Sequence, residues 1–162
     1  MKIFVTYGAG KGRTYKSAFD AALWDAGIAN YNILELSSVV PNGTDIEIKK
    51  INYNERNNHA ERGFKLYAVL AYKNETMSGK EAWAGVGWIQ SKKDNGGLFV
   101  EHHGESKEEV EKLIEDSLED MKKYRKEDFG EVQMKVHGIK CEGDEVCSLV
   151  SAVFESEDWR RD

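Results

Sequence analysis

Three strand-like segments follow one another between residues 64 and 104, and this succession constrains the fold more than any other feature of the chain. Apolar, aromatic and β-branched residues dominate residues 64–73, 81–91 and 97–104, as expected of strands. A short segment rich in Lys, Asp and Gly makes a tight connection between the last two. Strands spaced this closely leave no room for helices between them, so this part of the chain must form β-sheet.

The rest of the chain adds more strands and two helices. Five further segments have the composition of strands: residues 2–8, 31–40, 44–53, 131–141 and 147–156. Apolar residues recur at helical spacing in residues 15–27, and Ser106 with Glu109 forms a capping box at the start of a longer helix. Many strands with two helices predict a single α+β domain over residues 1–162, built as a layered sandwich whose helices cover the sheet faces.

Length and charge narrow the class of protein. The chain has 162 residues and a formal net charge of −6, and this length suits one domain with one core. An acidic protein is repelled by nucleic acid and by anionic membranes, so we expect neither as a partner. No apolar run is long enough to span a membrane, and the first residues turn polar too soon for a signal peptide, so we expect a cytoplasmic protein.

The glycine-rich residues 8–14 lie between a strand-like segment and a helical one, where a phosphate-binding loop would lie. A Walker loop needs Lys and Ser or Thr directly after its last glycine, but Arg13 follows Gly12. Arg13 also takes the place of the third glycine of a dinucleotide-binding loop. We therefore expect these glycines to form a tight turn, and a nucleotide-binding module remains an alternative.

Consecutive residues Glu101, His102 and His103 are of types that bind metals. Strand alternation, however, directs Glu101 and His103 to one face and His102 to the other. Two ligands on one face are too few for a metal site, so we predict none. A buried carboxyl at Glu101 would keep its proton near neutral pH and serve as a general acid, whereas a carboxylate at a strand end would be solvated.

Four more side chains could take part in binding or catalysis, although each is of a common type when taken alone. Asp20 projects from the first helix away from the apolar stripe, where its carboxylate could be solvated or could accept two hydrogen bonds from a guanidinium group. Asn32 and Ser38 are an even number of residues apart, so both could project from one strand face. Ser37 and Ser38 form an adjacent pair shortly before the only proline, Pro41.

Taken together, residues 17–41 resemble the self-processing segment of the pyruvoyl-dependent arginine decarboxylases. In that family a helix with a small residue, Phe and Asp leads through Ala-Gly-Ile to an Asn, and then to a strand that ends in Ser-Ser before a proline. The matching residues here are Ala18, Phe19, Asp20, Ala26, Gly27, Ile28, Asn32, Ser37, Ser38 and Pro41, and a later Gly-Leu-x-x-Glu ends at Glu101. The resemblance spans nearly the whole chain.

The resemblance implies an enzyme that cleaves itself. Ser38 would attack the carbonyl of Ser37, and the chain would split into residues 1–37 and residues 38–162, the second beginning with a pyruvoyl group derived from Ser38. This covalent cofactor would replace pyridoxal phosphate by forming a Schiff base with the α-amine of L-arginine, and loss of CO₂ would give agmatine. No separate cofactor and no metal ion are expected.

The same resemblance implies roles for particular side chains. Glu101 would protonate the substrate carbon after CO₂ has left, Asn32 would orient the pyruvoyl group or the processing intermediate, and Asp20 would hold the guanidinium group. Tyr31 and Val39 would contact the substrate. The family builds homotrimers with active sites between subunits on a four-layer α/β/β/α sandwich, and we expect both features here.

The chain also departs from the family pattern. Lys16-Ser17 stands where the family commonly has Leu-Asn, and Ala29 stands where it has Gly. Glu35 takes the place of a residue that is commonly basic. Lys16 and Ala29 leave open a decarboxylase of another amino acid, because a cation near the pocket would repel a guanidinium group. A non-catalytic trimeric relative that never cleaves is a further alternative, although the residues needed for cleavage and proton transfer are all present.

Overall fold

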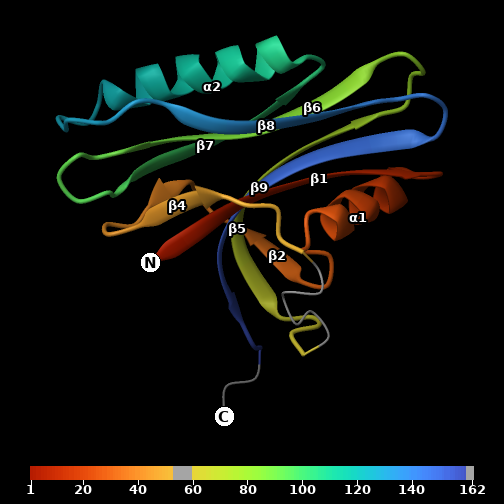
Figure 1. Ribbon diagram of the computed structural model, residues 1–162, viewed down its shortest axis with the longest axis horizontal. Helices are drawn as coiled ribbons and strands as arrows, with labels where there is room; N and C mark the ends of the chain where they lie inside the picture. The colour runs from red at the N-terminus through yellow and green to blue at the C-terminus, as the bar shows by residue number, and fades with distance from the viewer. Residues whose placement is uncertain (53–59, 160–162) are drawn as a thin grey trace.

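The computed structural model describes residues 1–52 and 60–159, which form two β-sheets stacked face to face between two helices (Figure 1). One helix packs on the outer face of each sheet. The predicted α+β layered sandwich is therefore confirmed. Among the described residues, no helix is both long enough and apolar enough to cross a membrane.

The two sheets differ in size and in how their strands are paired. The five-stranded sheet has the order β2-β5-β9-β1-β4, with β1 (Lys2–Gly12), β2 (Asn32–Glu35), β4 (Asp45–Ile48), β5 (Lys65–Glu75) and β9 (Glu145–Glu157). The four-stranded sheet has the order β3-β7-β6-β8, with β3 (Val39–Val40), β6 (Glu81–Gln90), β7 (Gly97–Gly104) and β8 (Gln133–Lys140). The short β2 pairs only with the first part of β5, so among the described residues the second part of β5 is an open sheet edge.

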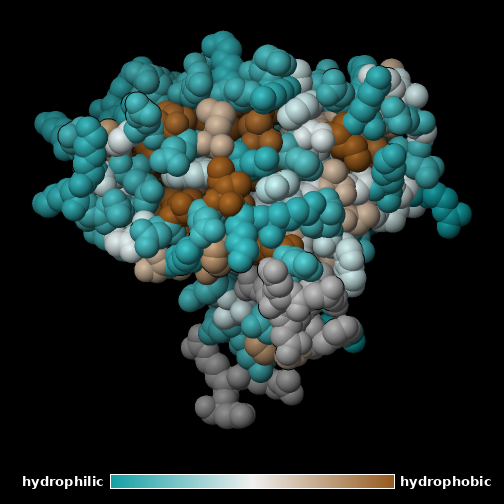
Figure 2. All heavy atoms as spheres, in the orientation of Figure 1, coloured by the Kyte–Doolittle hydropathy of each residue, from teal (hydrophilic) through white to brown (hydrophobic). Residues whose placement is uncertain are grey.

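Apolar side chains from both inner faces fill the space between the sheets. Ile3 and Val5 of β1 are fully buried there, and they belong to the same cluster as Trp88 and Phe99 of the other sheet. Full burial of such a side chain stabilises a fold by about 1.5–3 kcal/mol. Outside this layer, hydrophilic side chains dominate the face in Figure 2, and apolar ones form only small separate groups.

α2 (Lys107–Lys122) covers the four-stranded sheet and begins at the predicted cap. The Ser106 hydroxyl accepts the backbone N–H of Glu109 at 3.2 Å. The Glu109 carboxylate accepts the N–H of Glu105 rather than that of Ser106, so only the first half of the predicted capping box forms. The buried stripe of the helix consists of Val110, Ile114 and Leu118.

α1 (Tyr15–Asp25) packs closely on β1 because the alternating glycines Gly8, Gly10 and Gly12 lie beneath it. A Cβ added at Gly10 would lie 2.5 Å from the Cβ of Ala21, which is far inside van der Waals contact. The predicted tight turn is wrong here, since β1 continues through Gly12. The glycines instead remove the side chains where the helix backbone meets the strand.

The strand predicted over residues 31–40 is two separate strands. β2 ends at Glu35 in the five-stranded sheet, whereas β3 begins at Val39 and pairs antiparallel with β7 in the other sheet. The periodicity of the sequence could not reveal this break, because both short pieces keep the composition of a strand. The Ser37-Ser38 pair consequently lies in the crossing between the sheets.

We expect Gly10→Ala to lower the free energy of unfolding by about 1–3 kcal/mol, the usual range for an overpacked core. The added Cβ would lie 2.5 Å from both the Cβ of Ala21 and the backbone nitrogen of Ala22. Urea unfolding followed by circular dichroism measures the loss. Gly130→Ala is the control, because the nearest atom to its Cβ would be the Gln90 carbonyl oxygen at 3.6 Å. Equal losses in the two variants would contradict the close packing of α1.

Candidate active site

Ser38 lies where the chain crosses from one sheet to the other, and both sides of the crossing are hydrogen-bonded. The Leu36 N–H donates to the Ala68 carbonyl of the five-stranded sheet at 3.0 Å, and the Phe99 N–H of β7 donates to the Ser38 carbonyl at 2.8 Å. Between these anchors Ser38 has a φ of +69°, in the left-handed region that costs a non-glycine residue about 1–3 kcal/mol. The Ser37-Ser38 bond is thus held in a strained segment.

The Ser38 side chain is paired with a carboxylate. Its Oγ donates a hydrogen bond to Glu101 Oε2 at 2.8 Å, across a sequence separation of 63 residues. Glu101 lies two residues beyond Phe99 on the inner face of β7, which places it beside β3 and the crossing. The carboxylate is exposed, so the burial considered for Glu101 from the sequence is not present within a single chain.

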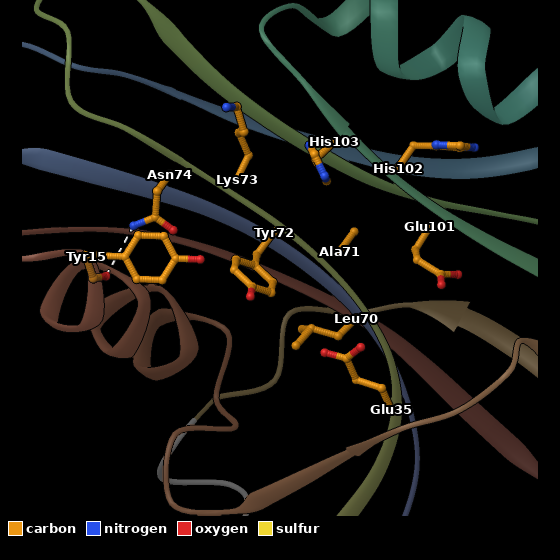
Figure 3. A pocket seen from close by; sticks show the side chains of 10 residues that line it. All are labelled: Tyr15, Glu35, Leu70, Ala71, Tyr72, Lys73, Asn74, Glu101, His102 and His103. Carbon is orange, nitrogen blue, oxygen red and sulfur yellow. Dashed lines mark hydrogen bonds between the residues drawn. The ribbon is translucent and has the colours of Figure 1, made fainter.

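A cavity of about 380 Å³ opens beside this pair along the free edge of β5 (Figure 3). It is lined by residues 70–74 of β5, residues 101–103 of β7, Tyr15 of α1 and Glu35 of β2. In Figure 3 the Glu101 and Glu35 side chains approach the β5 edge from different sheets. The cavity is therefore shared by Glu101, which accepts the hydrogen bond of Ser38, and a second carboxylate.

Tyrosine and amide groups form the end of the cavity next to α1. The side-chain N–H of Asn74 donates to the Tyr15 carbonyl at 3.2 Å. A hydrogen bond with the Tyr72 hydroxyl, together with partial burial, raises the pKa of Tyr15 to about 12, so this phenol stays neutral at physiological pH. The only sign of these residues in the sequence is the polar run of residues 73–75 in an otherwise apolar strand, and it did not predict a site.

The two histidines on β7 point in different directions, as strand alternation predicts. His102 Nε2 lies 2.7 Å from the Ser117 hydroxyl of α2, and burial lowers the pKa of His102 despite the opposing charge of Glu101. His103 lies on the other face, on the side of the β5 edge away from Glu35 (Figure 3). Among the described residues, no group of three or more His, Cys, Asp or Glu side chains is arranged to hold a metal ion.

Tyr31 and Asn32 lie at the start of β2, at the end of the strand away from Ser38. The Asn32 amide donates to the Gly63 carbonyl at 2.8 Å, and the buried Tyr31 donates its hydroxyl to the Glu61 carboxylate. The expectation that Asn32 and Ser38 share one strand face is wrong, because β2 ends before Ser38. Neither residue belongs to the lining of the cavity.

Asp20 and Val39 lie at the surface of the chain. Asp20 is exposed on α1 and, like Val39, is absent from the cavity lining. Val39 follows Ser38 directly, pairs with Leu98 of β7 and is 58% exposed. Of the residues predicted for the site, a single chain therefore brings together only the serine pair, its neighbour Val39 and Glu101.

Comparison with known proteins gives a consistent result. The chain matches the family described as pyruvoyl-dependent arginine decarboxylase (PvlArgDC) over residues 2–158. A protein of that name from Thermococcus kodakarensis is 31% identical over 134 residues, which is 82% of this chain and 81% of the relative. One from Thermococcus sibiricus is 30% identical over 94% of both chains. One from Picrophilus torridus is 34% identical over 67% of this chain, but the match spans only 59% of that relative.

We expect the Ser38→Gly variant to be more stable than Ser38→Ala by about 1 kcal/mol, because glycine adopts the left-handed conformation without a clash at Cβ. Both variants lack the hydroxyl that donates to Glu101, so their difference isolates the backbone strain at position 38. Urea unfolding at equal protein concentration measures it. Identical unfolding midpoints would show that the φ of +69° carries no strain.

Proposed function

This chain belongs to the pyruvoyl-dependent arginine decarboxylase family, and from that premise we propose that it cleaves itself between Ser37 and Ser38 and then converts L-arginine to agmatine and CO₂. The observation that carries the proposal is the state of Ser38. Its backbone is held in the left-handed region, and its hydroxyl donates to the Glu101 carboxylate at the edge of a cavity.

The cleavage chemistry uses groups that are already next to one another. Ser38 Oγ adds to the carbonyl carbon of Ser37 while Glu101, which accepts its hydrogen bond, takes the hydroxyl proton. The peptide bond becomes an ester. Loss of the Cα proton at position 38 then expels the Ser37 carboxylate and leaves dehydroalanine. Uptake of water and release of ammonia convert this residue to a pyruvoyl group.

The surroundings of position 38 suit such a group. The Phe99 N–H, which donates to the Ser38 carbonyl, would hold the same carbonyl after cleavage, and the cavity gives an amino acid access from the side of Glu101. A pyruvoyl group supplies an electron sink for the loss of CO₂, through a Schiff base with the substrate α-amine. The group is part of the chain itself, so the proposal requires neither pyridoxal phosphate nor a metal ion.

Glu101 has a second role in this proposal. Its carboxyl lies next to the position 38 side chain, where it delivers a proton to the substrate carbon after CO₂ has left. The carboxylate is exposed in the isolated chain. A bound substrate displaces water from the cavity, and this strengthens the electrostatic interactions of the carboxyl.

The other predicted residues require a neighbouring copy of the chain. Asp20 and Asn32 lie outside the cavity of their own chain, so Asp20 can hold a guanidinium group at this site only if α1 of another copy supplies it. Tyr31 would support the same surface from within the core, and Val39 would contact the substrate beside position 38. This arrangement agrees with the homotrimer expected from the resemblance.

The two fragments would stay together after cleavage. Residues 1–37 contribute β1, which lies between β9 and β4, and β2, which pairs with β5. None of these pairings includes the bond between Ser37 and Ser38. We therefore expect a native particle that separates into fragments only when it is denatured.

The wild-type protein should give two masses under denaturing conditions, residues 1–37 and a pyruvoyl-blocked chain beginning at position 38. Ser38→Ala should give one intact mass and no release of CO₂ from arginine, because the attacking hydroxyl is gone. Mass spectrometry of both purified proteins makes the test. Normal cleavage of the Ser38→Ala protein would disprove the mechanism, and an uncut wild-type chain would favour a non-catalytic relative.

Asp20→Ala should cleave normally yet raise the KM for arginine by about tenfold or more, since it removes charge-assisted hydrogen bonds to the guanidinium group. Steady-state release of CO₂ measures KM and kcat. Glu115→Ala, which removes an exposed carboxylate from α2, is the matched control. An unchanged KM in Asp20→Ala would remove this residue from the substrate site.

A further inference from the structure

Glu35 is the last residue of β2 and lines the cavity from the α1 side of the five-stranded sheet. Ile33, two residues earlier, packs into the core beneath α1, so strand alternation places Glu35 on the same face. Its backbone position is fixed by pairing with Ala68 of β5. Figure 3 shows its carboxylate next to the side chain of Leu70.

The Glu35 carboxylate has no cationic partner among residues 1–52 and 60–159. Within the part of the chain that the structure describes, no hydrogen bond or ion pair reaches it. Two other carboxylates of the five-stranded sheet and its helix are paired with lysines, Asp25 with Lys50 at 2.9 Å and Glu157 with Lys65 at 3.0 Å. A carboxylate beside Leu70 in a cavity, without a cation of its own, is suited to bind one from a ligand.

The charges of the cavity differ between its two sides. Lys73 lies on the same face of β5 as Ala71, which packs between the sheets, whereas Leu70 and Tyr72 face α1 together with Glu35. On the α1 side a cationic ligand group is attracted by Glu35, whereas on the inner side the attraction of Glu101 is opposed by Lys73. The cavity thus has a preferred orientation for a ligand with a cation at one end.

The size and lining of this side match an arginine side chain. Ser38 follows Glu35 by three residues, so their Cα atoms lie at most about 10 Å apart. Tyr15 and Tyr72 line the cavity on the same side, and tyrosine rings attract a planar guanidinium group through their faces. An amino acid attached at position 38 can therefore reach Glu35 with its far end.

We propose that Glu35 binds the guanidinium group of the substrate and makes the cavity selective for cationic over neutral side chains. It acts from the same chain as Ser38, in addition to the carboxylate of Asp20. The identification of the ligand as arginine rests on the proposed function, whereas the binding of a guanidinium group at Glu35 does not.

Isothermal titration calorimetry with two product-like ligands tests the inference without catalysis. Agmatine carries a guanidinium group, and N-carbamoylputrescine carries a neutral urea group of the same shape. We expect Glu35→Gln to raise the Kd of agmatine by about tenfold and to leave the Kd of N-carbamoylputrescine unchanged. Glu115→Gln, which alters an exposed carboxylate on α2, should change neither.

Each outcome bears on one of the two proposals. An agmatine Kd that is equal in the wild-type and Glu35→Gln proteins overturns the inference, as does an equal loss for both ligands. An uncut wild-type chain, or one that releases no CO₂ from arginine, overturns the proposed function alone, because the titration measures binding in either form of the protein. Normal self-cleavage of Glu35→Gln shows that the variant is folded.

Discussion

The crossing of the chain between the two sheets is the constraint on which the rest of the site depends. Stacked sheets lie about 10 Å apart, and only residues 36–38 join β2 to β3. Leu36 and Ser38 are hydrogen-bonded to different sheets, so the backbone has little freedom between them. The left-handed conformation of Ser38 follows from this demand, and the same geometry directs its hydroxyl to Glu101.

The close packing of α1 on β1 also shapes the cavity. Because the glycines of β1 carry no side chains, the helix backbone lies directly on the strand. Its first residue, Tyr15, can then meet Asn74 at the end of β5. The wall of the cavity opposite Glu101 is therefore built by a packing feature of β1, which contributes no residue to the cavity.

The proposed cleavage between Ser37 and Ser38 would leave the two sheets intact. The bond lies between the sheets and not within one, so breaking it leaves every strand pairing in place. β1 is an inner strand of its sheet, paired with β9 along most of its length. The apolar layer between the sheets draws side chains from both sides of this bond, among them Ile3 and Trp88, and apolar burial does not depend on chain connectivity.

The sequence by itself determined the features that depend on neighbouring residues: the strand-rich α+β class, the cap at Ser106, and the Ser37-Ser38 motif with its family resemblance. Local periodicity could not separate β2 from β3 or extend β1 through its glycines, because sheet membership depends on partners far along the chain. Only the tertiary structure decided that Glu101 meets Ser38 across 63 residues and that Glu35 lines the same cavity as Glu101. Such contacts follow from the pairing of strands and the stacking of sheets, which no local pattern specifies.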